Sequence, residues 1–101
     1  MIPILPEDLE LEHEAPSPSH GRFVLKRSGR EVGELTYRSF GTRVYADHTF
    51  VVPELRGERL AIHLVAALVR WVKAEDKHIV PECSYVRAAL ARHPEWKSLA
   101  V

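Results

Sequence analysis

The sequence predicts a mixed α/β fold, in which an antiparallel meander of short strands precedes a helix, a short strand and a second helix. Three observations lead to this prediction. Between residues 23 and 52, short apolar runs of strand type are separated by turns that contain glycine. Beyond Pro53, apolar residues recur at helical spacing. A short apolar run at Ile79 and Val80 then precedes another segment of helical character.

Three strands joined by tight turns form the predicted meander. The first begins at Phe23 and ends in a turn over residues 28–30, and the second covers residues 31–40. Gly41 and Thr42 then turn the chain into a third strand over about residues 43–52. Pro53 ends this strand, because proline has no N–H to donate to a neighbouring strand.

The N-terminal segment, residues 1–21, is expected to be loosely ordered, because it contains four of the seven prolines. Leu9, Leu11 and His13 alternate with glutamates, which is compatible with a short edge strand. The sequence APSPSHG that follows, residues 15–21, is expected to be a loop.

The first helix is expected from about Gly57 to Glu75. Its apolar residues share one face: Ala61, Leu64, Val65, Leu68 and Val72. This helix connects the third strand of the meander to the short strand at Ile79, so the two strands are expected to lie parallel in a right-handed crossover.

The second helix is expected from about Ser84 to Arg92. It ends at His93, because Pro94 disfavours helical geometry in the residue before it. The remaining segment places Trp96 where it can pack back on the body of the domain.

Length and composition indicate one soluble domain. The chain has 101 residues, of which 46% are hydrophobic and 28% charged, and its fourteen basic and fourteen acidic residues balance. This balance argues against nucleic acid or an anionic membrane as a partner. The single cysteine, Cys83, and the absence of a membrane-length apolar run or a signal-peptide pattern favour a cytoplasmic protein. The histidines have no metal-ligand spacing, so no metal is expected.

The segment from Asp47 to Leu64 combines an apolar strand, a turn broken by proline and the start of a helix. A helix start exposes free backbone N–H groups and the positive end of the helix dipole, which together bind phosphate-type anions. Arg56 and Arg59 in the turn strengthen this prediction, because a guanidinium group matches the geometry of phosphate oxygens.

Four motifs agree in order and spacing: GELTYR at residues 33–38, DHTFVVPELRGERLA at 47–61, PECSYV at 81–86 and RHPEW at 92–96. On these motifs the sequence resembles the minimal, single-domain group of GNAT-type N-acetyltransferases. The resemblance implies that the chain binds acetyl-CoA. It also implies that the pantetheine arm lies along the strand that ends in Val51 and Val52.

The resemblance further implies that the pyrophosphate lies on the turn that follows this strand. The matching positions are Arg56, Gly57, Glu58, Arg59, Leu60 and Ala61. Arg59 stands where the motif has glycine. If the backbone there has a positive φ, arginine adds strain and narrows the approach of the phosphate; if the φ is helical, the guanidinium adds a phosphate contact.

Three residues are candidates for the chemistry. Cys83 follows the short strand and is expected near the thioester, although most lone cysteines are small buried hydrophobes. Tyr85 matches a tyrosine that in many such enzymes protonates the departing thiolate, and its alternative role is structural. His48 is a candidate general base, or else a structural histidine. Asp47 cannot easily orient His48, because adjacent strand residues point to opposite faces.

The expected function is therefore acetyl transfer from acetyl-CoA to an amine, by direct attack in a ternary complex. The acceptor is expected to be an exposed lysine, a chain terminus or a small amine. Two alternatives remain: a CoA-binding module without turnover, and a non-enzymatic interaction domain that keeps only the fold. They differ in whether CoA stabilises the protein and whether any amine is acetylated.

Overall fold

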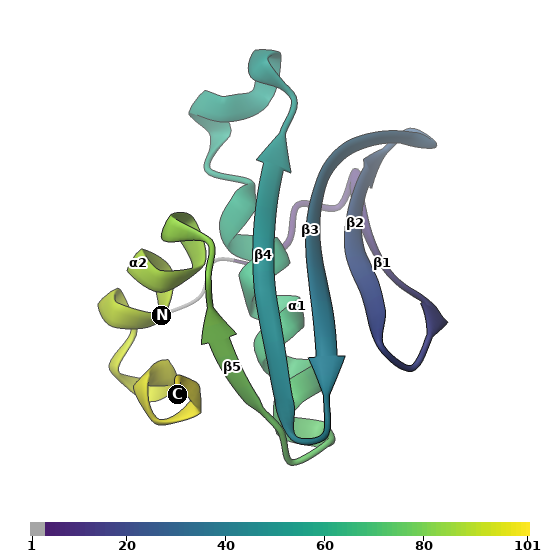
Figure 1. Cartoon of the computed structure of the whole chain (residues 1–101). Helices are drawn as coiled ribbons and strands as arrows, with labels where there is room; N and C mark the ends of the chain where they lie inside the picture. Colours follow the sequence, from purple (N-terminus) through teal and green to yellow (C-terminus); the bar gives the residue numbers. More distant parts are fainter. Residues whose placement is uncertain (1–3) are drawn as a thin grey trace.

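The computed structural model describes residues 4–101 of the chain. Residues 1–3, the first part of the segment 1–21 that was expected to be loosely ordered, lie outside the described residues. Five strands form a single sheet in the order β1-β2-β3-β4-β5 (Figure 1). The elements follow one another as β1 (Leu9–Ser17), β2 (His20–Arg27), β3 (Arg30–Phe40), β4 (Arg43–Val51), the 3-10 helix η1 (Pro53–Glu58), α1 (Ala61–Ala74), β5 (His78–Pro81), α2 (Ser84–Arg92) and the 3-10 helix η2 (Pro94–Leu99).

The sheet has the mixed topology that the sequence predicts. The first four strands pair antiparallel with their neighbours, and β5 pairs parallel with β4 after the connection through α1. The predicted fold class is confirmed, and the bounds of β4, β5 and α2 agree with the expected ones to within about one residue.

The prediction of a loop over residues 15–21 was wrong. Strand β1 continues through Ser17, and only Pro18 and Ser19 form the turn to β2. The register shifts between Glu14 and Ser17, which accommodates Pro16. Because β1 lies at the edge of the sheet, a proline can occupy it without removing a hydrogen bond from a central ladder. Proline content alone therefore misled the prediction.

The expected start of the first helix at Gly57 was also wrong, since α1 begins at Ala61. Residues Pro53–Glu58 form the tighter 3-10 helix η1, and Arg59 follows in the left-handed region with φ 57° and ψ 44°. A right-handed helix cannot pass through a left-handed residue, so the chain starts a new helix after it.

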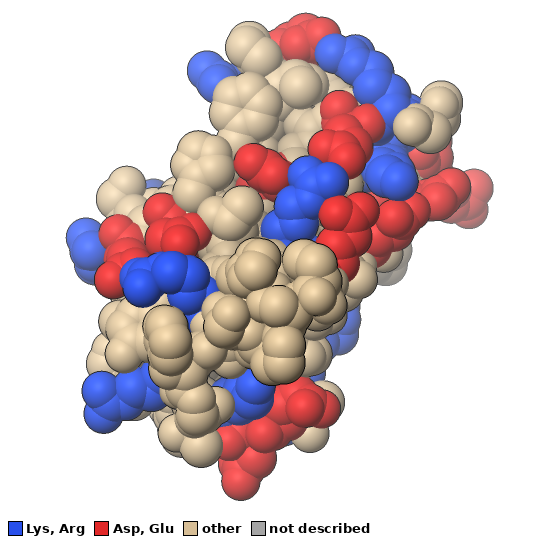
Figure 2. Space-filling view, turned by 45° about the vertical axis from the view of Figure 1, so that its right-hand side comes forward, with Lys and Arg blue, Asp and Glu red and all other residues tan. Residues whose placement is uncertain are grey.

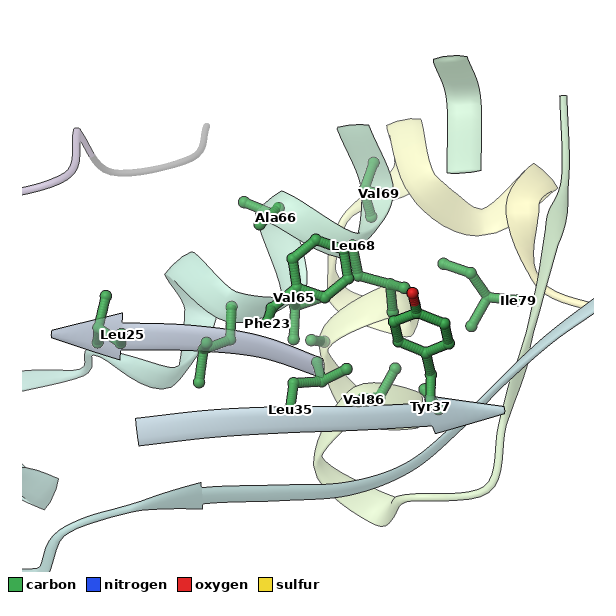
Figure 3. Packing of buried hydrophobic residues seen from close by; sticks show 14 of the residues in the cluster. Phe23, Leu25, Leu35, Tyr37, Val65, Ala66, Leu68, Val69, Ile79 and Val86 are labelled. Carbon is green, nitrogen blue, oxygen red and sulfur yellow. The ribbon is translucent and has the colours of Figure 1, made fainter. Parts of the chain in front are cut away.

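The hydrophobic core lies between one face of the sheet and α1. In Figure 3, Phe23, Leu35 and Tyr37 of the sheet lie toward Val65 and Leu68 of α1, and all five side chains are buried. The apolar face of α1 thus covers the middle strands, as its spacing predicts.

The C-terminal segment closes one end of this core. Trp96 in η2 is only 1% exposed, so it packs back on the domain as expected. The backbone N–H of Val101 donates to the carbonyl of Ile79, and Ala100 forms a bridge with the same strand. The free edge of β5 is therefore partly covered by the chain's own last residues.

We call the face of the sheet that points away from α1 the outer face. Figure 1 shows α1 behind the sheet and no helix in front of it. Charged side chains project from this face and form ion pairs, such as those of Arg22 with Glu34 and of Arg38 with Glu82. None of the helices among residues 4–101 is long and apolar enough to cross a membrane.

Candidate functional site

The sheet splits between β4 and β5. The two strands pair over only four residues each, from Arg43 opposite His78 to Ala46 opposite Pro81. Beyond this point β4 continues to Val51, whereas the segment after β5 leaves the sheet and forms α2. The backbone N–H of Cys83 donates to the carbonyl of Ala46 at 2.9 Å, and this bond marks the point where the two strands separate.

A β-bulge in β4 lies beside the split. Tyr37 pairs with Ala46 and Thr36 pairs with His48, so Asp47 has no partner in the register. A bulge bends its strand and increases the local twist. The carboxylate of Asp47 accepts a hydrogen bond from the hydroxyl of Thr36 on the outer face. The bulge therefore lies where β4 leaves β5.

A cleft of about 640 Å³ extends from the split along the free side of β4 to the start of α1. Ten residues line it: Thr49, Val51, Arg56, Arg59, Leu60, Ala61, Ile62, Tyr85, Arg92 and His93. Six of them are among the site residues expected from the sequence. Of the other expected residues, Val52, Gly57, Glu58, Cys83 and His48 are not part of this lining.

The cleft is strongly basic. Arg56 and Arg59 line it from the turn before α1, and Arg92 lines it from the end of α2, next to His93. Among the residues that the structure describes, no aspartate or glutamate is part of the lining. Among residues 4–101, no group of three or more His, Cys, Asp or Glu side chains is arranged to hold a metal ion. The cleft is thus suited to an anionic ligand.

The start of α1 adds backbone donors to this basic environment. Leu60 precedes the helix, and no side chain caps its N-terminus. The first N–H groups of a helix have no partner within it, and Ala61 and Ile62 border the cleft. Arg59, just before them, has the positive φ that favours glycine, and a non-glycine residue there costs about 1–2 kcal/mol.

Arg56 holds the rim of the cleft against β4. Its Nε donates to the carbonyl of Val51 at 3.0 Å, and its guanidinium carbon lies 5.4 Å from the centre of the Phe50 ring. The guanidinium is thereby fixed between the strand end and the turn, with Nη groups that make no hydrogen bond to another described residue.

Cys83 lies immediately before α2, outside the lining of the cleft but in contact with it. Its Sγ is 3.5 Å from Oγ1 of Thr49, which lines the cleft. Burial alone would raise the pKa of the thiol. Hydrogen bonds from the Thr49 hydroxyl and from the backbone N–H groups of Val86, Tyr85 and Thr49 outweigh burial, so the pKa of Cys83 is lowered.

Tyr85, the second residue of α2, lines the cleft and is 37% exposed. Burial raises the pKa of its phenol, and the charge of Arg92 opposes this effect only in part. The phenol therefore keeps its proton at neutral pH, which is the state needed to donate one.

His48 lies on the outer face, opposite Thr36 in the register. It is exposed and its ring stacks on Phe50 with 6.5 Å between the ring centres. Asp47 contacts Thr36 and Arg38 rather than His48. The bulge interrupts the expected alternation, so both side chains lie on the outer face, but they form no hydrogen bond with each other.

Four lining residues of the candidate site were not among those expected from the sequence, namely Thr49, Ile62, Arg92 and His93. Thr49 is the one of these that lies on β4. As a β-branched residue in a strand, it has an obvious structural role and attracts no functional interpretation. Its position two residues before Val51 was the available signal, because residues two apart on a strand share a face. If the strand is expected to border a ligand through Val51, then Thr49 is expected to border the same ligand.

Solved structures with this fold include acetyltransferases. A GCN5-like protein from Staphylococcus aureus, solved by NMR, superimposes with a TM-score of 0.71 at 22% identity, over 94% of this chain and 90% of that one. The aminoglycoside N-acetyltransferase AAC(6')-Iy in complex with CoA gives 0.56 at 18% identity, over 75% and 67% of the two chains. Its complex with a bisubstrate analogue gives the same TM-score and identity, over 75% of this chain and 61% of that one.

These similarities show that the chain has the fold of acetyltransferases. A family model for GCN5-related N-acetyltransferases matches residues 22–99. The chain therefore belongs to the GCN5-related N-acetyltransferase family, as its motifs led us to expect.

Proposed function

We propose that this protein binds acetyl-CoA in the cleft and transfers the acetyl group to a primary amine by direct attack in a ternary complex. The main supporting observation is the polarity of the cleft along its length. One end is formed by Arg56, Arg59 and the N-terminus of α1, and the other end lies beside Cys83 and Tyr85, within reach of the charge of Arg92. A ligand with phosphates at one end and a thioester at the other matches this arrangement.

The phosphates are held at the basic end. Free N–H groups at the start of α1 and the guanidinium groups of Arg56, Arg59 and Arg92 face the same cleft. In this proposal Arg59 is a phosphate ligand, although it occupies a glycine's place. Its side chain lines the cleft, and the strain of its backbone is already accommodated in the folded protein.

The pantetheine arm extends along β4. The N–H of Val52 donates to Val32 of β3, so the alternation of a strand turns the backbone of Val51 and Thr49 toward the cleft. The two amides of pantetheine extend the sheet by pairing with this backbone. Arg56 holds the Val51 carbonyl in the free protein, and that contact shifts or is shared when the arm binds.

The reaction joins the amine nitrogen to the carbonyl carbon of the acetyl group. The tetrahedral intermediate then breaks the carbon–sulfur bond, and the departing CoA thiolate takes the proton of Tyr85. The amine loses its proton to a base on the acceptor side, for which His48 is the candidate because it lies exposed on the outer face. Solvent then restores both protonation states.

A second route passes through Cys83, and its lowered pKa favours this candidate. The Cys83 thiolate attacks the acetyl carbonyl, the bond to the CoA sulfur breaks, and the departing CoA thiolate takes the proton of Tyr85. The amine then attacks acetyl-Cys83, the bond to the Cys83 sulfur breaks and releases the Cys83 thiolate, and the amine proton passes to the Tyr85 phenolate. Intact mass after exposure to acetyl-CoA tests this route, with Cys83→Ala as the control; the same acetylation of both proteins excludes it.

One experiment separates the enzyme from its alternatives. The protein is incubated with acetyl-CoA and a panel of amines, and acetylated products are detected by mass spectrometry while melting temperature is measured with and without CoA. Enzymatic transfer predicts product and stabilisation, which reaches about 2.7 kcal/mol at a hundredfold excess of ligand over Kd. Stabilisation without any product indicates a CoA-binding module. Neither effect indicates an interaction domain.

A further inference from the structure

The outer face of the sheet carries an excess of negative charge. Its ion pairs join Arg22 to three glutamates, Lys26 to one, and Arg38 to Asp47 and Glu82, so three cations meet six carboxylates. Figure 2 shows acidic and basic side chains interleaved where this face turns toward β1. The cofactor cleft has the opposite character, because arginines line it and no carboxylate does. Charge is therefore separated between the two sides of a chain whose net charge is zero.

Arg38 bridges the split in the sheet on this face. Its Nη2 lies 2.6 Å from Oε1 of Glu82, and its Nε lies 3.4 Å from Oδ2 of Asp47. Its guanidinium also covers the Tyr45 ring at 5.1 Å. Asp47 is the bulge residue of β4, and Glu82 directly precedes Cys83. Two carboxylates thus flank the outer opening of the split, and an internal cation lies between them.

A hollow of about 330 Å³ leads away from this opening across the outer face. It is lined by Glu14, Pro16, His20, Gly21, Arg22, Thr36, Tyr37, Arg38 and Asp47. The hollow therefore connects the bulge in β4 with the turn between β1 and β2. In its lining the carboxylates of Glu14 and Asp47 are paired with Arg22 and Arg38, and its Asp47 end lies beside the split.

We propose that the acceptor is a lysine within a cationic polypeptide segment, which docks along this hollow and inserts the lysine amine between Asp47 and Glu82. This inference rests on the proposed function and specifies its acceptor. The excess of carboxylates on the outer face complements a basic segment, and lysine has a thin, flexible stem that can enter a narrow opening. Arg38 holds the place of the incoming cation in the free protein and is displaced when the segment docks.

A series of peptides tests the charge preference. Each has one lysine, flanked by arginines, by alanines or by glutamates, and acetylation is measured at low and high salt. We expect the basic peptide to have the lowest KM, by about fivefold relative to the alanine peptide, and this advantage to shrink with salt because exposed charges are screened. Equal KM values for the basic and alanine peptides would overturn the proposal.

Variants test the position of the opening. Glu82→Gln and Asp47→Asn are expected to raise KM for the basic peptide about threefold to tenfold, with KM for acetyl-CoA unchanged, because each removes one carboxylate. Arg38→Gln is expected to lower KM for the peptide, because it removes the internal competitor. Glu75→Gln is the matched control, since Glu75 is exposed and follows α1 on the other side of the sheet. An effect of Glu75→Gln as large as that of Glu82→Gln excludes a local site.

A binding experiment separates this proposal from the proposed function. The basic peptide, with its lysine intact, is labelled, and its Kd is measured by fluorescence anisotropy without acetyl-CoA for wild type and Glu82→Gln. If wild type acetylates no amine, the proposed function fails. The docking inference still stands if the peptide binds with a Kd that rises with salt and on loss of Glu82. A Kd that is independent of both overturns it.

Discussion

The sulfur of Cys83 and the hydroxyl oxygen of Thr49 lie 3.5 Å apart, across the point where β4 and the start of α2 diverge. In the neutral state the thiol donates to the hydroxyl. When the thiol loses its proton, the hydroxyl can turn and donate to the thiolate, together with the N–H groups at the start of α2. This contact joins the strand that borders the cleft to the helix that closes it.

The Thr49 contact predicts a change in thiol reactivity. Alkylation by iodoacetamide needs the thiolate, so wild-type Cys83 is expected to react at a lower pH than an ordinary cysteine. Thr49→Val removes the hydroxyl donor and moves the pH profile of the alkylation rate upward, whereas Thr49→Ser restores it. A profile that is the same for all three proteins would show that the hydroxyl has no part in lowering the pKa.

Arg59 offers a test of the turn between β4 and α1. Arg59→Gly relieves the strain of a left-handed backbone but removes a guanidinium from the cleft. We expect the affinity for acetyl-CoA to fall by about threefold to tenfold, as for one charge-assisted contact of 0.6–1.4 kcal/mol, while the free energy of unfolding does not fall. Isothermal titration calorimetry and urea denaturation measure the two quantities. Tighter binding by the glycine variant would mean that Arg59 obstructs the phosphates.

Gly21 is expected to tolerate no side chain. A Cβ at this position would lie 2.5 Å from the hydroxyl of Tyr37 and 2.6 Å from the carbonyl of Glu14, and Tyr37 is buried. Gly21→Ala should therefore lower the free energy of unfolding by about 1–3 kcal/mol, as overpacking does. Gly57→Ala is the control for stability, because its Cβ would meet nothing within 4 Å. Urea denaturation of both variants decides the comparison.

Two histidines make stability depend on pH. Burial lowers the pKa of His63, assisted by the charge of Arg70, and burial also lowers the pKa of His13. The unfolded chain therefore binds more protons than the folded one below about pH 6.5, so stability falls as the pH decreases through this range. His63→Leu removes one titrating group, and its unfolding free energy should fall less between about pH 7.5 and pH 5.5 than that of wild type. Parallel losses in both proteins would contradict this assignment.

Much of the fold follows from local patterns in the sequence. The glycine turns at residues 28–30 and 41–42, the stop at Pro53 and the helical spacing after it each have a direct physical cause, and all recur in the structure. The length of β1 in the N-terminal hairpin was underestimated, because the prolines of this segment favour a loop. The strand extends to Ser17 because Ser17 pairs with His20 across the two-residue turn, beyond the register shift that includes Pro16.

The site was predictable where a motif marks it and not where geometry alone creates it. The turn from Arg56 to Ala61 is visible as a strand end, a break and a helix start. The place of His48 on the outer face depends on the bulge at Asp47, and no local signal in the sequence announces that bulge. The ion pair between Arg38 and Glu82, which bridges the outer opening, joins residues 44 positions apart, so the opening exists only in the folded sheet.

The short pairing of β4 with β5 has a consequence for how the protein assembles. The first four strands are neighbours in sequence, so their hairpins close small loops and are expected to form early, whereas the pairing of β5 requires α1 to be in place first. The basic cleft is completed only when this last unit docks. Acetyl-CoA in the cleft would then tie the late unit to the early one, so the substrate itself contributes to the cohesion of the native chain.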